Sequence, residues 1–451
     1  MPSLFEKGKK ICLVGIGGIS MSALAITLAH RGYDVYGTDR AESDMTGKLV
    51  SLGIPVVIGH KPETVEGAAC IVCTAAVHDD NPEIRRAREL GIPVYRRSEG
   101  WGELMGKCRD VLCVCGCHGK STTTALCTHI ALEAGLDPSV MIGAVLPVID
   151  GNVRCGGDGL FVAEACEYCD SFLDFPPTVA VVNNIEEDHL DYFKDLDAIK
   201  ASFRRFVEKV PARGAVVANH DDANTVEVVE GCGKRVVWFG LHEGDVHAED
   251  LRDEKGFYSF VLVTPAARRA VKLRIPGVYN VYNALAASAA YYALGADPDA
   301  CVRGIEAFGG IARRFEVVGE YNGIPVIDDY AHHPTALRDL LRTVREMGYA
   351  RIVCVFQSHT YSRTAQLYDD FIDALRLADV AVVADIYAAR EVNTWGVSAK
   401  AMAEALPDGV YAGDFDGICA YLRENAREGD VILTVGAGDV YKVGQMLLGK
   451  M

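Results

Sequence analysis

Short apolar runs, each followed by a glycine-rich or polar turn and a helical pattern, recur along the chain. The run Ile11–Val14 precedes the turn Gly15–Ser20 and an apolar segment that we expect to be helical to about His30. A second run, Val35–Asp39, ends on an acidic residue. This order is typical of a dinucleotide-binding βαβ unit. We expect the alternation to continue to about residue 100.

Two further stretches repeat the order. Val111–Cys115 is a continuous apolar run, typical of a buried parallel strand, and we expect the next helix to end near Glu133. In the third stretch, Ile324–Ile327 predicts a strand and Asp328–His333 a loop, while Pro334 suits the first turn of a helix. The pattern therefore predicts the α/β class throughout.

Composition narrows the function classes. The 451 residues suggest about three domains, and a chain with 50% hydrophobic and 24% charged residues is an ordinary globular one. The net charge of −17 gives no overall attraction to nucleic acid or anionic lipid. We find no apolar run of about 18 residues and no signal-peptide pattern, so we expect a cytoplasmic protein without membrane insertion.

The 15 cysteines are odd in number, and many lie in apolar runs, which favours small buried side chains in a reducing compartment. Two CxxC pairs, Cys70/Cys73 and Cys166/Cys169, are far more widely separated than the roughly 15–20 residues of a zinc ribbon. We therefore expect neither a zinc site nor redox chemistry from these pairs.

The segment Gly116–Ser121 carries the sharpest chemical signal. A glycine turn between a buried strand and a helix lets backbone N–H groups face a phosphate. Lys120 can reach the β- and γ-phosphates of a nucleotide, and Ser121 can bind Mg²⁺. The spacing is GxxGK[ST] rather than the usual GxxxxGK[ST], and the alternative is an ordinary turn between strand and helix.

The first glycine turn, Gly15–Ser20, is less specific because it follows GxGxxS rather than GxGxxG. Such a loop can hold a diphosphate, but NAD, FAD and nucleotide sugars all fit, and a merely structural turn is the alternative. With Asp39, it also leaves open an NAD-dependent oxidoreductase, which would leave Lys120 and Ser121 unexplained.

Glu164 and His189 each follow a predicted strand of the central stretch, Leu160–Ala163 and Val179–Val182. Carboxyl ends of parallel strands meet at one edge of a sheet, so these side chains should lie near Lys120. Such a group suits metal-assisted phosphoryl transfer. Taken alone, His189 could equally be a hydrogen-bonded loop residue.

Ionisable residues also gather in the third stretch, at Asp328–Pro334, at Arg313 and Arg314, and at Arg363. Binding residues often occupy loops at strand ends. The alternative is a solvated turn with surface ion pairs.

Together these motifs resemble the Mur ligase family of peptidoglycan synthesis, in the family's order and over nearly the whole chain. The segments that carry the resemblance are Gly15–Ser22, Gly116–Thr124, Asn184–Asp191, Pro276–Ala284, Arg313–Glu316, Asp328–Thr335 and Phe356–Thr364. The last segment is most like that of the alanine-adding members.

The resemblance implies three domains: a Rossmann-like domain at 1–107 for a UDP-linked substrate, a P-loop ATPase domain at 108–315, and a Rossmann-like domain at 316–451 for an amino acid. It implies an ADP-forming ligase that uses ATP and Mg²⁺ to join L-alanine to the lactyl carboxylate of UDP-N-acetylmuramic acid through an acyl phosphate. A monomer or homodimer would be expected. A nucleotide-gated binding protein without ligase activity remains a further alternative.

The resemblance also implies residue roles. The expected nucleotide-binding residues are Gly116, Cys117, His118, Gly119, Lys120, Ser121, Thr122, Asn283, Arg314 and Asp329. The expected substrate-binding residues are Gly15, Gly17, Gly18, Ser20, Met21, Asp39, Tyr330 and Arg363. Ser121 and Glu164 should bind one Mg²⁺ and His189 a second, and either His332 or Asp329 should be the base. The expected catalytic set is Lys120, Glu164, His189 and His332.

The chain departs from the family pattern at four positions. Cys166 and Cys169 stand where acidic residues are usual, Tyr279 replaces a histidine, and Thr360 replaces an arginine. Without that arginine, we expect Arg363 to hold the carboxylate of the amino acid, and glycine or serine becomes an alternative substrate.

Overall fold

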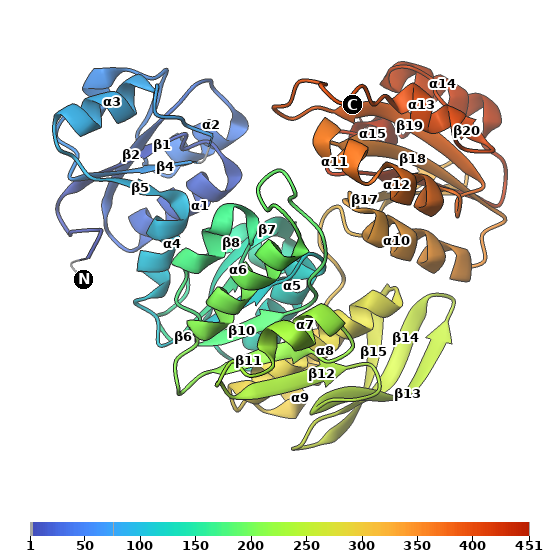
Figure 1. Cartoon of the computed structure of the whole chain (residues 1–451), viewed down its shortest axis with the longest axis horizontal. Coiled ribbons are helices and arrows are strands. Elements are labelled where there is room, and N and C mark those ends of the chain that lie inside the picture. The colour runs from blue at the N-terminus through green and yellow to red at the C-terminus, as the bar shows by residue number, and fades with distance from the viewer. Residues whose placement is uncertain (1–2, 75, 451) are drawn as a thin grey trace.

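Three β-sheets with helices on their faces follow one another along the computed structural model, which describes residues 3–74 and 76–450 (Figure 1). The first sheet is parallel, with the order β3-β2-β1-β4-β5. Its strands are β1 (Lys10–Val14), β2 (Asp34–Asp39), β3 (Val56–Ile58), β4 (Cys70–Cys73) and β5 (Val94–Arg96). The helices are α1 (Ile19–His30), α2 (Asp44–Ser51), η1 (Pro62–Val65), α3 (Pro82–Glu89) and α4 (Arg97–Met105). The strand order reverses at β1, so the glycine turn after β1 lies where ligands bind in such sheets.

The central sheet has the order β15-β14-β13-β12-β11-β10-β6-β9-β7-β8. Its strands are β6 (Asp110–Cys115), β7 (Ser139–Leu146), β8 (Gly151–Arg154), β9 (Leu160–Glu164), β10 (Val179–Val182), β11 (Ala215–Asn219), β12 (Val236–Gly240), β13 (Val246–Glu254), β14 (Phe257–Val263) and β15 (Arg268–Pro276). Its helices are α5 (Lys120–Glu133), η2 (Pro147–Ile149), η3 (Tyr168–Asp174), α6 (Leu196–Glu208), α7 (Ala223–Val229), α8 (Val278–Ala293) and α9 (Pro298–Ala307). The pairings from β7 through β13 are parallel, which brings the ends of β6, β9 and β10 to one edge.

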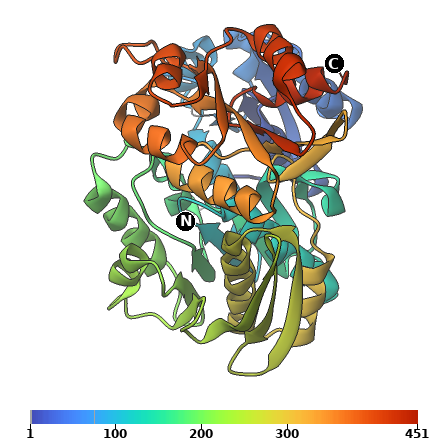
Figure 2. The same ribbon diagram turned by 90° about the vertical axis from the view of Figure 1, so that its right-hand side faces the viewer.

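The third sheet has the order β16-β17-β21-β18-β19-β20, parallel except for β16. Its strands are β16 (Glu316–Tyr321), β17 (Ile324–Asp329), β18 (Arg351–His359), β19 (Val380–Tyr387), β20 (Gly409–Val410) and β21 (Asp430–Val435). Its helices are α10 (Pro334–Glu346), α11 (Tyr361–Gln366), α12 (Tyr368–Leu375), α13 (Ala399–Glu404), α14 (Phe415–Asn425) and α15 (Tyr441–Leu447). Figure 1 and Figure 2 both show α10 on the side of this sheet that faces the central domain.

The structure confirms the α/β class and corrects one boundary. The loop expected over Asp328–His333 is shorter, because β17 continues through Asp329 beside β21. Asp328 and Asp329 are both buried, so the interpretation of this segment as a solvated turn is wrong. Sheet pairing with β21 overrides the polar character of the two residues. Among the described residues, no helix is long and apolar enough to cross a bilayer.

Candidate active site

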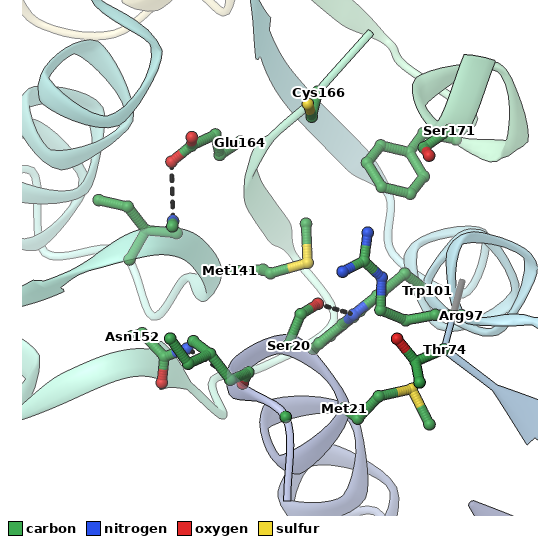
Figure 3. Close-up of a pocket in the computed structure, with 15 residues that line it drawn as sticks. Ser20, Met21, Thr74, Arg97, Trp101, Met141, Asn152, Glu164, Cys166 and Ser171 are labelled. Carbon is green, nitrogen blue, oxygen red and sulfur yellow. Dashed lines mark hydrogen bonds between the residues drawn. The ribbon is translucent and has the colours of Figure 1, made fainter. Parts of the chain in front are cut away.

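A cavity of about 370 Å³ opens between the N-terminal and central domains. From the N-terminal domain it is lined by Gly18, Ser20 and Met21, at the start of α1. Glu164, at the end of β9, lines it from the central domain (Figure 3). The structure therefore brings part of the predicted substrate loop and one predicted metal ligand to the same cavity.

The glycine turn after β1 is held by the second strand. The backbone N–H groups of Gly15 and Ile16 donate to the Thr38 carbonyl at 2.8 and 2.9 Å. The Gly17 N–H donates to Asp39 Oδ2 at 2.8 Å, and a Cβ on Gly17 would lie only 2.9 Å from that oxygen. Asp39 thus fixes the turn, which leaves the first turn of α1 to face an anionic ligand.

Arg97 is a cavity residue that the motifs did not indicate. It begins α4, and its guanidinium points into the cavity beside Trp101, whose Nε1–H donates to Ser20 Oγ at 3.2 Å (Figure 3). Burial lowers the pKa of Arg97, and no carboxylate of the described residues forms an ion pair with it. An unpaired, partly desolvated cation of this kind attracts an anion.

The nucleotide loop joins β6 to α5 and requires two glycines. Gly116 and Gly119 adopt φ values of +133° and +76°, which only glycine adopts without strain. A Cβ on Gly119 would lie 2.4 Å from Asn283 Oδ1 on α8. The His118 N–H donates to Asn184 Oδ1 at 2.8 Å. The predicted loop therefore packs against Asn283, as the motif positions suggest.

Lys120 forms an ion pair with a buried carboxylate. Its Nζ lies 3.1 and 3.2 Å from the two oxygens of Glu167 and 2.5 Å from the Gly116 carbonyl. Burial alone would lower the pKa of Lys120, but the charge of Glu167 outweighs it and holds that pKa well above its usual value. Lys120 is thus a stable cation that can exchange Glu167 for a phosphate oxygen.

The predicted metal ligands have different neighbours. Glu164 Oε2 accepts the Gly143 N–H at 2.7 Å, whereas His189 Nε2 lies 3.5 Å from Glu167 Oε1. Ser121 is buried in the first turn of α5, and burial lowers the pKa of His189. The carboxylates beside His189 are therefore those of Glu167 and, at 3.7 Å, Asp188.

Arg363 connects the C-terminal domain to the central domain. Its Nη2 lies 2.9 Å from Oδ1 of Asp188, which is buried in the loop after β10. Nearby, His332 Nδ1 faces the Tyr330 carbonyl at 3.0 Å. Burial, reinforced by the charge of Arg363, holds the pKa of His332 well below its usual value. The predicted anchor and the predicted base are thus close to one another and to the central domain.

The arginine pair and the acidic pair of the third motif lie close together and share one ion pair. Arg313 forms a 3.0 Å ion pair with Asp328, and Arg314 lies over the Tyr330 ring at 5.0 Å. Asp329 accepts the backbone N–H groups of Phe315 and Ala331, each at 2.8 Å. This network links the end of the central domain to β17 of the C-terminal domain.

Comparisons with known proteins agree with this geometry. Three family models match the chain: "Mur ligase family, catalytic domain" at residues 10–109, "Mur ligase middle domain" at 114–291, and "Mur ligase, glutamate ligase domain" at 313–438. A UDP-N-acetylmuramate–L-alanine ligase from Caldanaerobacter subterraneus is 46% identical over 98% of both chains. A protein of the same name from Acetivibrio thermocellus is 45% identical, over 98% of this chain and 96% of the relative.

Solved structures give the same result. The crystal structure of a UDP-N-acetylmuramate-alanine ligase from Thermotoga maritima is 30% identical, covers 98% of both chains and has a TM-score of 0.81. A murein peptide ligase from Psychrobacter arcticus shares the fold at 24% identity and a TM-score of 0.74. The family prediction is confirmed: with a full-length fold match and the three domain models in order, this chain belongs to the Mur ligase family.

Proposed function

We propose that this chain joins L-alanine to the lactyl carboxylate of UDP-N-acetylmuramic acid and converts ATP to ADP and phosphate. The observation that carries the proposal is the cavity between the first turn of α1 and Glu164. Glu164 ends β9, which pairs with β6, the strand that enters the ATP loop. Arg97 supplies the cation that a UDP diphosphate requires. A reaction that consumes ATP and a nucleotide sugar belongs in the cytoplasm.

In this proposal, each of the three domains binds one of the three substrates. Residues 1–107 bind the UDP substrate, residues 108–315 bind ATP, and residues 316–451 bind the amino acid. Two anions, a carboxylate and a triphosphate, must meet, so positive charge has to gather at the central edge. Lys120 supplies part of it when it leaves Glu167 for the triphosphate.

The donors at this edge suit Mg²⁺, because Ser121 at the start of α5 and Glu164 at the end of β9 offer oxygen ligands. His189 and Glu167 follow the neighbouring strands β10 and β9. When bound, Mg²⁺ neutralises phosphate charge and orients the γ-phosphoryl group. Glu164 already has one oxygen fixed by Gly143, which orients the carboxylate.

Two bond exchanges complete the reaction. A carboxylate oxygen of the sugar attacks the γ-phosphorus, the bond to ADP breaks, and Lys120 stabilises the charge that develops. The neutral amine of L-alanine then attacks the acyl carbon, phosphate leaves, and the amine gives up one proton.

His332 suits the role of base better than Asp329. It is neutral because its pKa lies well below the usual value, and its Nδ1 faces the Tyr330 carbonyl, which leaves Nε2 as an acceptor. Asp329 already accepts two backbone N–H groups. His332 is therefore the residue that we place at the amine, and Arg363 is the residue that we place at the alanine carboxylate.

Measurement of ADP release tests the activity. We expect release only when UDP-N-acetylmuramic acid and an amino acid are both present, with L-alanine preferred over glycine and L-serine. ADP release that ignores the UDP substrate would contradict the ligase assignment. A preference for glycine or L-serine would keep the ligase but change the amino acid.

The metal assignment has a separate test. We expect Glu164→Gln and His189→Ala each to raise the Mg²⁺ concentration that gives half-maximal activity by at least tenfold, because each removes a ligand. Glu249→Gln, at an exposed carboxylate of β13, is the control and should leave it unchanged. Unchanged Mg²⁺ dependence in both site variants would contradict the assignment.

A further inference from the structure

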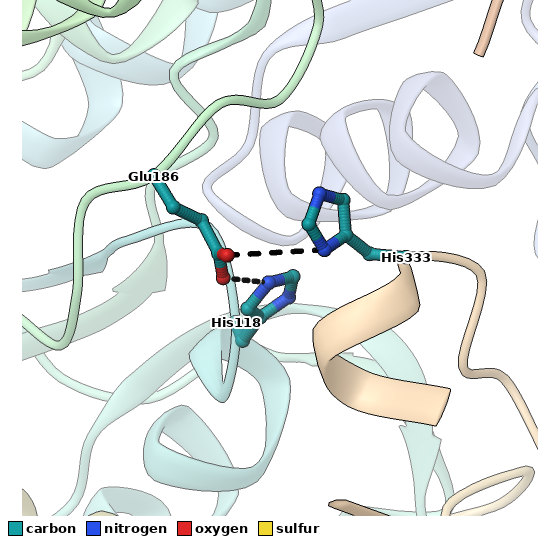
Figure 4. Close-up of side chains that lie close together, drawn as sticks. All are labelled: His118, Glu186 and His333. Carbon is teal, nitrogen blue, oxygen red and sulfur yellow. Dashed lines mark ion pairs between the residues drawn. The ribbon is translucent and has the colours of Figure 1, made fainter. Parts of the chain in front are cut away.

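A second group of possible metal ligands lies where the central and C-terminal domains meet. It consists of His118 in the nucleotide loop, Glu186 in the loop after β10, and His333, the residue that caps α10 (Figure 4). His118 Nε2 contacts Glu186 Oε1, and His333 Nδ1 lies 3.9 Å from Glu186 Oε2. One ligand atom from each residue lies within 4.8 Å of the other two.

The neighbours of this group hold its ligand atoms in place. His333 Nε2 lies 3.0 Å from the Glu187 carbonyl, so the ring carries its proton on Nε2 and presents the Nδ1 lone pair, which also lies 3.3 Å from the Thr335 N–H. Thr335 Oγ1 donates to Glu186 Oε2 at 2.9 Å. A metal-binding histidine usually donates the N–H of its other ring nitrogen to a backbone carbonyl or carboxylate, as His333 Nε2 does to Glu187.

The charges of the group also suit a cation. Burial, together with the nearby His118, lowers the pKa of His333, so its ring is neutral at pH 7. Burial would raise the pKa of Glu186, but the hydrogen bond and charge of His118 outweigh it, so Glu186 is ionised. His333 Nδ1 lies too far from Glu186 Oε2, at 3.9 Å, for a hydrogen bond, and it accepts the Thr335 N–H at 3.3 Å instead. A cation between Nδ1 and the carboxylate would replace this long capping hydrogen bond.

The separation is close to that of a zinc site. Ligands about 2.0–2.2 Å from a tetrahedral Zn²⁺ lie roughly 3.3 Å apart. Modest side-chain rotations would therefore bring all three ligand atoms within bonding distance of one ion. Two imidazoles and one carboxylate select Zn²⁺ or Co²⁺, whereas the Mg²⁺ of the reaction prefers oxygen ligands.

We propose that His118, Glu186 and His333 bind a divalent transition-metal ion of the Zn²⁺ or Co²⁺ class, with water in the fourth position. The ion would join the nucleotide loop of the central domain to the N-terminus of α10 in the C-terminal domain. This site lies outside the proposed ligase reaction, and its bound ion would restrain the separation of the two domains.

Titration with Co²⁺ tests the site without measuring turnover. The full chain is freed of metal with a chelator, kept free of nucleotide, and titrated while visible absorption is recorded. We expect the d–d bands of four-coordinate Co²⁺ at one equivalent, and a Tm that rises with bound Co²⁺. Glu186→Gln and His333→Asn should each weaken Co²⁺ binding at least tenfold. Asparagine is chosen at 333 because it still caps a helix.

The second possible metal group, Cys166, Glu167 and His189, supplies the control. Cys166→Ser should leave the Co²⁺ bands and affinity unchanged, because the proposed site contains no sulfur. Wild-type protein that binds no Co²⁺, or binding that only Cys166→Ser weakens, would overturn the proposal. Circular dichroism confirms that each variant is folded. Because turnover is not measured, failure here is separate from failure of the ligase assignment.

Discussion

At the scale of single residues, Lys120 and Glu167 form a buried ion pair at the start of the nucleotide-binding helix. Glu167 is 1% exposed, so its carboxylate depends on Lys120 for compensation. Lys120→Ala should lower the rate of ADP release by about 10²–10³ and leave the affinity for the UDP substrate unchanged, because that substrate binds in another domain. Steady-state kinetics and direct titration with the UDP substrate check both expectations.

The same variant also leaves Glu167 buried without a partner, which costs about 3–5 kcal/mol of the free energy of unfolding. The double variant Lys120→Ala, Glu167→Gln should recover most of that stability but none of the activity. Activity of Lys120→Ala near the wild-type rate would contradict the role given to the nucleotide loop.

Arg363 is the second residue whose role depends on a charge. A charge-assisted contact contributes about 1.5–3 kcal/mol, so Arg363→Ala should raise KM for L-alanine by about 10–150-fold and leave KM for ATP almost unchanged. The structure adds that Asp188 would lose its partner at the same time. Arg376→Ala, which removes an exposed arginine of the same domain, is the control. An unchanged KM for every amino acid would place the carboxylate anchor elsewhere, with Arg390 and His359 next to test.

At the scale of elements, the junction between β6 and α5 makes the nucleotide loop rigid. Gly119→Ala would place a Cβ 2.4 Å from Asn283 Oδ1 in a left-handed conformation, so we expect ATP affinity to fall at least tenfold. Gly135→Ala is a matched control at the other end of α5, with φ +70° and open space around its Cβ. Gly135→Ala should lose about 1 kcal/mol of stability from its left-handed backbone alone, and Gly119→Ala more because of the added clash. Only Gly119→Ala should affect titration with ATP.

Local pattern predicted most of the parallel elements. Strand β10 has the predicted bounds, and α5 ends at Glu133 as expected, because apolar runs and glycine turns are encoded over short distances. The antiparallel strands β13–β15 were not predicted. In β15, buried and exposed residues alternate from Val271 to Ile275, which is typical of a half-buried strand, so the sequence did carry a signal for this element.

Only part of the candidate site could be predicted from the sequence, because some of its residues belong to no local motif. Motif positions such as Lys120 and Glu164 follow from local spacing, so the sequence could indicate them. Arg97 follows no such motif. The ion pair between Asp188 and Arg363 joins residues 175 positions apart, and only the arrangement of the domains brings them together. The partners of catalytic groups therefore came from the structure.

At the scale of the whole molecule, half-buried histidines lie where the central and C-terminal domains meet. Burial, reinforced by Arg363, lowers the pKa of His359 to about 4. His332 and His189 also have lowered pKa values, mainly through burial. All three remain neutral at pH 7 in the folded protein, and each must be protonated against the charge of Arg363 as the pH falls. The contact between these domains is therefore sensitive to acid.

We expect the free energy of unfolding to fall as the pH drops from about 6.5 toward 4. In that range the unfolded chain binds more protons at these histidines than the folded chain does, so stability rises with pH, by up to about 1.4 kcal/mol per pH unit for each. Asp188, whose pKa is lowered, loses its contribution only below about pH 4. Urea unfolding measured from pH 7.5 to 4.5 checks this slope. His359→Asn should make it shallower, whereas His220→Asn, at an exposed histidine, should not. A slope that His359→Asn leaves unchanged would show that His359 is not held neutral between the domains.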